Sequence, residues 1–219
     1  MFRRFYVVPA LVIAVMIGLL IADCGDSNVQ TVDKQNANTQ TAQQPAEQPM
    51  HDNSPAMKGG SAGAAGIMWS VPDEWVTGPD KPMRVATYVI GQEDNAPECA
   101  VYYFGPGQGG DVESNIQRWI GQFEQPDGSN SSDKATVGKR EVNGLPVTTI
   151  DLTGTYDASM GGPMSGQKVQ HPGYRMLGAI IEAPKGPVFF KLTGPQELVG
   201  GAESDFSQMV ESVAKTGSA

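Results

Sequence analysis

The sequence predicts an α+β domain with a mainly antiparallel sheet of about seven strands and two packed helices. Three observations predict it. Short runs rich in β-branched and aromatic residues alternate with turn sequences, the pair Asn143-Gly144 is typical of a β-hairpin, and two segments carry apolar residues at helical spacing. Hairpin turns join neighbouring strands in opposite directions, so the sheet is expected to be antiparallel. The expected order is three strands, helix, four strands, helix.

Three strands are expected before the first helix. They cover Ile67 to Val71, which Pro72 is expected to close, then Arg84 to Ile90 and Glu98 to Phe104. The period then changes, because five large apolar residues recur three or four positions apart with Asp111 placed to cap the first turn. These residues are Val112, Ile116, Trp119, Ile120 and Phe123. They predict one helix with a buried face.

Two hairpins and a second helix are expected after the first helix. The strands of the hairpins are Ala135 to Val142, Leu145 to Tyr156, Tyr174 to Ala183 and Pro187 to Thr193. The last helix runs from about Ala202 to Ala214, with Phe206 and Met209 on its apolar side.

Length and charge limit the function. A chain of 219 residues is long enough for one folded domain, and a net charge of -9 opposes binding of nucleic acid. The two cysteines, Cys24 and Cys99, exclude a disulfide-rich scaffold and a zinc site made of several thiolates. Cys99 falls in the middle of a predicted strand, where a buried thiol is expected.

The N-terminal residues 1–26 are expected to direct the chain to a membrane. Arg3 and Arg4 precede an uncharged apolar run from Phe5 to Ala22, which is the layout of an export signal. The residues Leu20 to Cys24 resemble the lipobox of bacterial lipoproteins, which implies a lipid on Cys24. Asp23 departs from that pattern, so lipidation and an uncleaved anchor helix both remain open. Either one places the chain in the cell envelope, membrane-anchored and facing the periplasm or the exterior.

Residues 27–66 are expected to form a disordered tether, because they hold almost no large apolar side chains. His51 lies within it. All three tryptophans follow Gly66, so a single domain is expected over residues 67–219.

The segment WSVPDEW from Trp69 to Trp75, together with the expected order of elements, resembles the entry of PsbP-like α/β/α sandwich domains. The resemblance covers about residues 67–214. It implies an extrinsic subunit or a protein-binding module and transfers no catalytic residue.

Three segments fit catalytic or cofactor-binding motifs, and none is expected to perform that chemistry. Gly105 to Gly110 fits GxGxxG, but Asp111 stands where a phosphate would bind, so we expect a glycine-rich turn and no cofactor. Ser131 and Lys134 fit SxxK, but they lie in a polar loop. A Ser/His/Asp triad would need His171, and no nucleophile elbow is present. No catalytic residue and no metal ligand set is therefore expected.

The segment from Asp157 to Gly173 shows neither strand nor helix periodicity and is expected to be a long loop. Its flexible apolar residues Met160 and Met164, with His171, are the candidate contacts for a partner protein. The expected function is a membrane-tethered, extracytoplasmic binding or assembly module without catalytic activity. The alternatives are a small hydrolase, which needs a polar cleft around His171, and a carrier of a small apolar ligand, which needs a pocket between sheet and helix.

Overall fold

The computed structural model describes residues 58–160 and 167–217. These residues belong to one compact unit that spans residues 51–219. Cys24, His51 and Met164 lie outside the described residues, so the expectations for the signal segment, for lipidation and for Met164 stay predictions.

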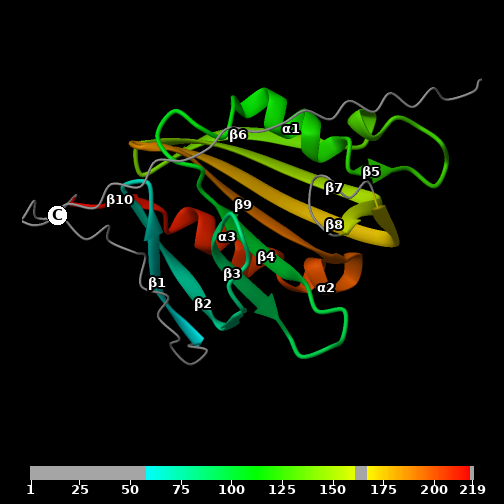
Figure 1. Ribbon diagram of the computed structural model, residues 1–219, viewed down its shortest axis with the longest axis horizontal. Helices are drawn as coiled ribbons and strands as arrows, with labels where there is room; N and C mark the ends of the chain where they lie inside the picture. Colours follow the sequence, from blue (N-terminus) through cyan, green and yellow to red (C-terminus); the bar gives the residue numbers. More distant parts are fainter. Residues whose placement is uncertain (1–57, 161–166, 218–219) are drawn as a thin grey trace, which may run out of the picture. The chain divides into compact units, whose positions relative to one another are not determined.

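A mainly antiparallel sheet forms the body of this unit and confirms the α+β class (Figure 1). Its order is β1-β2-β3-β4-β9-β8-β7-β5, with β10 beside β2 and β6 beside β7. The strands are β1 (Lys58–Ala64), β2 (Ile67–Thr77), β3 (Arg84–Ile90), β4 (Glu98–Tyr102), β5 (Phe123–Glu124), β6 (Thr136–Val142), β7 (Leu145–Met160), β8 (Gln167–Ala183), β9 (Gly186–Pro195) and β10 (Ala214–Lys215). The sheet brings β4 and β9 together although many residues separate them in sequence.

Helices cover both faces of the sheet. The helix α1 (Val112–Ile120) lies on one face, and α2 (Gln196–Gly201) and α3 (Glu203–Glu211) lie on the other (Figure 1). A short 3₁₀ helix, η1 (Ser131–Asp133), precedes β6. Two apolar cores result, one under α1 around Trp119 and Phe189, and a larger one around Trp69 and Phe190 that includes the buried side chains of α3.

The first helix is confirmed together with its cap. The Asp111 carboxylate accepts a hydrogen bond from the Ser114 backbone N–H at 2.8 Å, which satisfies one of the free donors of the first turn. Trp119 is buried and its ring lies against Gly178 of β8, where an added Cβ would come within 2.5 Å of the ring. A glycine at this position therefore lets the tryptophan reach the sheet.

The hairpin between β6 and β7 is also confirmed. Asn143 and Gly144 have φ of 50° and 73°, the left-handed pair that a two-residue hairpin turn requires. The Asn143 side chain also donates a hydrogen bond to the Val213 carbonyl, at 2.9 Å.

The expected boundary of the tether at Gly66 is wrong. Residues 58–64 form β1, which pairs antiparallel with β2. A strand made mostly of Gly, Ser and Ala is held by backbone hydrogen bonds, and side-chain composition does not reveal these.

The expected end of the first strand is wrong too, because β2 continues through Pro72 to Thr77. Pro72 lies at an irregularity between the pairs Lys58–Val76 and Gly60–Val71, and a residue without an N–H is tolerated at such a bulge.

The long loop expected from Asp157 to Gly173 is wrong as well. Strands β7 and β8 continue into this segment, and they pair from Tyr156–His171 to Met160–Gln167. A bulge beyond Gly154 and a φ of 70° at Gly173 interrupt the regular alternation that sequence periodicity detects. The C-terminal helix also differs, because the chain forms the two short helices α2 and α3, and the first of them begins before the expected Ala202.

Candidate functional site

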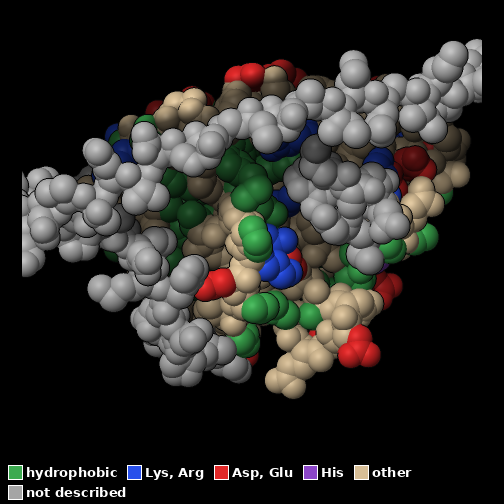
Figure 2. Space-filling model, in the orientation of Figure 1, with side chains coloured by type: hydrophobic (Ala, Val, Ile, Leu, Met, Phe, Trp, Pro, Cys, Tyr) green, Lys and Arg blue, Asp and Glu red, His purple; other side chains and the backbone are tan. Residues whose placement is uncertain are grey.

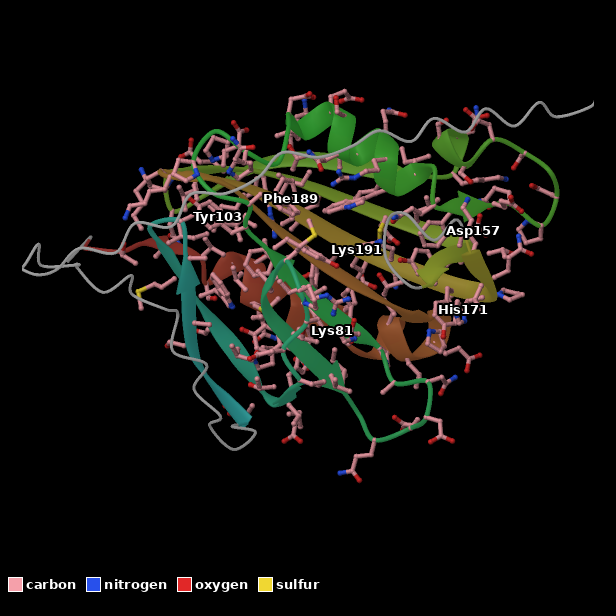
Figure 3. All side chains as sticks on the ribbon, in the orientation of Figure 1. Lys81, Tyr103, Asp157, His171, Phe189 and Lys191 are labelled. Carbon is pink, nitrogen blue, oxygen red and sulfur yellow. The ribbon has the colours of Figure 1, made fainter. Side chains whose placement is uncertain are left out.

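The central strand β9 places a lysine among large apolar residues. Along a strand successive side chains point to opposite faces, so Phe190 and Leu192 enter the core on the α3 side, while Phe189 and Lys191 face the α1 side. Trp119 of α1 packs on Phe189, with ring centroids 6.4 Å apart. Lys191 lies further along β9, past the part of the strand on which Trp119 packs (Figure 3).

A cleft of about 510 Å³ opens on this part of the sheet. The strands β3, β4, β7, β8 and β9 all contribute to its lining, and so does Gln122, which follows α1. The lining residues that matter for its chemistry are Arg84, Glu98, Tyr156, His171, Tyr174 and Lys191. The space-filling view shows basic side chains over β3 and β4 with hydrophobic atoms around them (Figure 2).

Lys191 has neutral hydrogen-bond partners. Its Nζ donates to Gln122 Oε1 at 2.5 Å and to the Tyr156 hydroxyl at 3.1 Å, and it lies 4.8 Å from the centroid of the Tyr156 ring. The residue is 8% exposed. The ion pairs found among the described residues do not include it. This ammonium is therefore largely removed from water, and no carboxylate of residues 58–160 or 167–217 forms an ion pair with it.

The environment favours the neutral form of the amine. Burial lowers the pKa of Lys191 to about 7, and the positive charges of Arg118 and Arg84 act in the same direction. Burial raises the pKa of Tyr156 to about 12, so its phenol stays neutral near pH 7 and supplies no counter-charge.

The carboxylate of Glu98 at the cleft is already paired. Arg84 Nη1 lies 2.5 Å from Glu98 Oε1, and Lys81 also forms an ion pair with Glu98. Burial alone would raise the pKa of Glu98, but hydrogen bonds and charge from Lys81 and Arg84 outweigh it and hold that pKa below its ordinary value. Two cations thus share one carboxylate, and Lys191 adds a third positive group nearby.

Aromatic rings form one wall of the cleft. The rings of Tyr156 and Tyr174 stack with centroids 6.3 Å apart and an interplanar angle of 8°. His171 lies next to Tyr174, and the centroids of these two rings are 4.7 Å apart. The structure therefore brings His171 into a polar cleft, whereas nothing is described of the Met160 side chain or of Met164.

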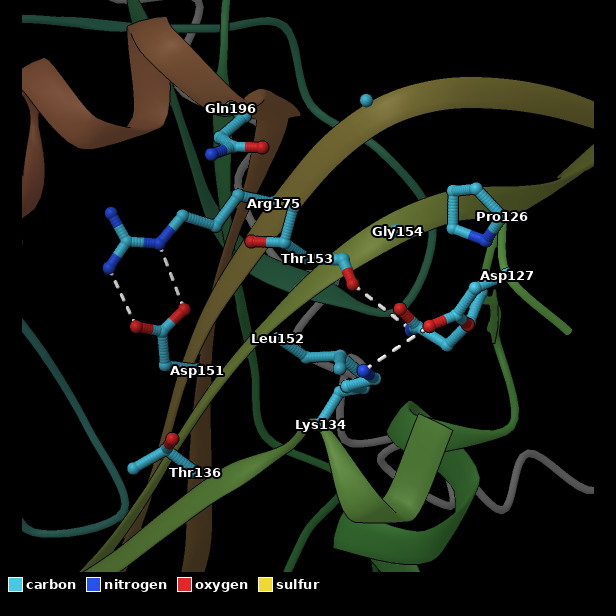
Figure 4. Close-up of a pocket in the computed structure, with 12 residues that line it drawn as sticks. Pro126, Asp127, Lys134, Thr136, Asp151, Leu152, Thr153, Gly154, Arg175 and Gln196 are labelled. Carbon is cyan, nitrogen blue, oxygen red and sulfur yellow. Dashed lines mark hydrogen bonds and ion pairs between the residues drawn. The ribbon is translucent and has the colours of Figure 1, made fainter. Parts of the chain in front are cut away.

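In a larger pocket of about 660 Å³ beside β7 and β8, the positive side chains pair with carboxylates (Figure 4). Arg175 donates to both oxygens of Asp151, at 2.8 and 2.6 Å, and to Glu203 at 2.8 Å. Lys134 lies 3.3 Å from Asp127 in the same pocket. Its cations already have carboxylate partners.

A third pocket, of about 270 Å³, lies between the sheet and α3. Phe206 and Val210 meet Lys139, Arg140 and Glu203 in its lining. Its small volume and charged lining do not favour the expected alternative of a carrier for an apolar ligand.

The residues of the sequence motifs have structural roles. Gly105, Gly107, Gly109 and Gly110 all have positive φ, so the GxGxxG segment is a glycine-rich turn into α1. The Ser131 hydroxyl donates to the Phe123 carbonyl at 2.7 Å. Cys99 is fully buried, and burial raises the pKa of its thiol. No cluster of metal-ligating side chains occurs within residues 58–160 and 167–217, and no helix of this part is long and apolar enough to cross a membrane.

Sequence reasoning missed Lys191, Tyr156, Arg84 and Glu98. The one available signal was the lysine inside the apolar run Val188 to Leu192, because a central strand rarely carries a charge that has no role. The other residues come together only through long-range strand pairing.

Comparisons with known proteins concern the fold. No family model and no curated protein matches the sequence. Among solved structures, the chain is similar to the solution structure of cyanobacterial PsbP (CyanoP) from Synechocystis sp. PCC 6803, with 11% identity, a TM-score of 0.44, and coverage of 74% of this chain and 95% of that chain. It is also similar to the crystal structure of PA94, a protein of unknown function from Pseudomonas aeruginosa, with 9% identity, a TM-score of 0.39, and coverage of 70% and 94%.

Proposed function

We propose that the chain is a membrane-tethered, extracytoplasmic binding module without catalytic activity, and that it binds its partner at the Lys191 cleft. The observation that carries the proposal is the buried Lys191 ammonium, whose hydrogen-bond partners among the described residues are neutral and which opens onto a cleft of about 510 Å³. A buried charge without an opposite charge is costly, and a ligand that supplies one lowers that cost.

The location rests on the N-terminal sequence. Arg3 and Arg4 before an apolar run, followed by Cys24, support export and a membrane tether. The proposal of binding without catalysis is supported by the contacts that the polar groups of the cleft already make within the protein. Glu98 pairs with two cations, the Tyr156 hydroxyl accepts a hydrogen bond from Lys191, and the His171 ring lies against Tyr174.

Crosslinking in the native envelope tests the proposal. A photoreactive p-benzoylphenylalanine replaces His171 at the cleft in the full-length chain, and mass spectrometry identifies what becomes attached. We expect one dominant adduct that is lost when Lys191→Met is added. The same probe at the exposed Lys139 of β6, outside the cleft, is the matched control. An equal pattern at both positions, or an adduct unaffected by Lys191→Met, would show that the cleft is not the binding site.

A further inference from the structure

The chemistry of the Lys191 cleft narrows what its partner presents. Resting on the proposed function, we infer that the cleft binds a single carboxylate carried next to a flat apolar group, with the carboxylate acting as the missing counter-ion of Lys191. This carboxylate belongs either to a free small acid or to the C-terminal residue of a protein partner.

The charges around Lys191 favour a monoanion. From β3 and β4, Arg84 and Glu98 face the cleft as an ion pair 2.5 Å apart, and Asp94 lies at its edge. Arg118 of α1 contributes a further positive charge. Tyr102, Tyr156, Tyr174 and His171 complete the titratable groups that face the cleft. Of the lysine and arginine side chains that line the cleft, Lys191 is thus the one for which no carboxylate contact is found among the described residues, so one negative charge on the ligand is enough to pair it.

The hydrogen bonding of the ammonium leaves room for a ligand oxygen. An ammonium has three donors, and Gln122 Oε1 and the Tyr156 hydroxyl receive two contacts from Lys191. Hydrogen bonds between charged partners are about twice as strong as neutral ones, so a carboxylate is the acceptor that this group gains most from.

The rings select the rest of the ligand. Tyr156, Tyr174 and His171 present a series of adjacent rings along one wall. Aromatic side chains bind flat apolar groups through burial and offset stacking. A cleft of about 510 Å³ lies within the size range of small-molecule sites, so it accommodates a ring together with its carboxylate.

Binding is expected to depend on pH, since the carboxylate needs the protonated amine. With a pKa of about 7 for Lys191 in the free protein, the protonated fraction falls about eightfold from pH 7.5 to 8.5. The affinity for a carboxylate should fall by the same factor. The affinity for a neutral ligand should not change over this range.

The experiment uses the full-length chain in a mild detergent and measures dissociation constants by ligand-observed NMR. The probes are 2-naphthoate and its neutral counterpart 2-naphthamide for the small acid, and N-acetylphenylalanine and its amide for a chain terminus. Whichever carboxylate binds at pH 6.5 identifies the source, and we expect its neutral counterpart to bind at least tenfold more weakly. Lys191→Met should remove the difference, whereas the exposed Lys139→Met should keep it.

Several results would overturn the inference. One is equal binding of acid and amide, and another is tighter binding of the dianion 2-naphthyl phosphate than of 2-naphthoate. A third is loss of the pH dependence in His171→Asn, which would assign the titration to His171 instead. If no carboxylate binds while the native crosslink at the cleft still depends on Lys191, this inference fails and the proposed function stands. Thermal unfolding of each variant shows that it is folded.

Discussion

Lys191 is the residue that gives the cleft its unpaired positive charge among the described residues. The sheet holds it between β4 and β8, where its stem is surrounded by protein and its ammonium meets an amide oxygen and a phenol. Removing an ammonium from water costs several kcal/mol unless a charge compensates, and the lowered pKa expresses that cost. A buried ammonium of this kind is tolerated at a site where a bound ligand supplies the opposite charge.

The burial of Lys191 should make the free energy of unfolding depend on pH. The pKa of Lys191 is about 7 in the folded state against an ordinary value of 10.5, so between these values the unfolded chain binds more protons than the folded one. The contribution of Lys191 to the free energy of unfolding therefore rises with pH across that window, by at most about 1.4 kcal/mol per pH unit.

Denaturant unfolding of the wild type and Lys191→Met at pH 7, 8 and 9 measures the effect. We expect the wild type to gain stability relative to the variant as pH rises. The exposed Lys139→Met serves as the control and should track the wild type. A constant difference between wild type and Lys191→Met across this range would contradict the lowered pKa.

At the scale of elements, α1 determines which part of the sheet is open. Its apolar side, centred on Trp119, covers Phe189 and Gly178, and the helix ends at Ile120. The chain then turns so that Gln122 reaches Lys191. A short helix therefore both closes the core and leaves the cleft exposed.

The contact of Trp119 with Gly178 predicts two destabilising substitutions that depend on each other. Trp119→Ala removes a buried ring and should cost about 3 to 5 kcal/mol. Gly178→Ala places a Cβ within 2.5 Å of that ring and should cost about 1 to 3 kcal/mol. In the double variant the added Cβ no longer meets the Trp119 ring and keeps only its close contact with Ile150 Cγ2, at 2.8 Å, so the total cost should be less than the sum of the two. Chemical denaturation of the four proteins gives the coupling, and strict additivity would mean that the two residues do not touch.

Elements with a strong local pattern could be predicted from the sequence. The apolar spacing and Asp111 define α1, and Asn143-Gly144 defines a hairpin, because each depends on neighbouring residues. The strand β1 and the far ends of β7 and β8 could not, since they are held by backbone pairing and are interrupted by bulges. Their side chains carry little trace of that pairing.

At the scale of the molecule, the candidate site depends on how distant strands meet. The sequence predicts that His171 is a partner contact in a loop, and it lies instead in a strand opposite Tyr156. The cleft joins residues from Arg84 to Lys191, and only the completed sheet order brings them together. A single sequence holds no local signal for that arrangement.

Attachment to the membrane is the second property of the whole chain that can be tested. We expect the full-length protein to sediment with membranes and a chain lacking residues 1–26 to remain in the supernatant, because the apolar run precedes Cys24. Cys24→Ser separates the two mechanisms. Release by this change indicates a lipid on Cys24, and retention indicates an uncleaved helix. A full-length protein that does not sediment would contradict the tether.

A measurement of the Lys191 pKa tests whether a buried ammonium, with no carboxylate partner among the described residues, defines the binding site. The protein is labelled with ¹³C-lysine, and the Lys191 signal is assigned by its absence in Lys191→Met. Its Cε shift is then followed from pH 5 to 11. We predict a midpoint near 7, far below the ordinary lysine value of 10.5. A midpoint near the ordinary value of 10.5 would mean that Lys191 is solvated or already paired, and the proposed site would lose its basis.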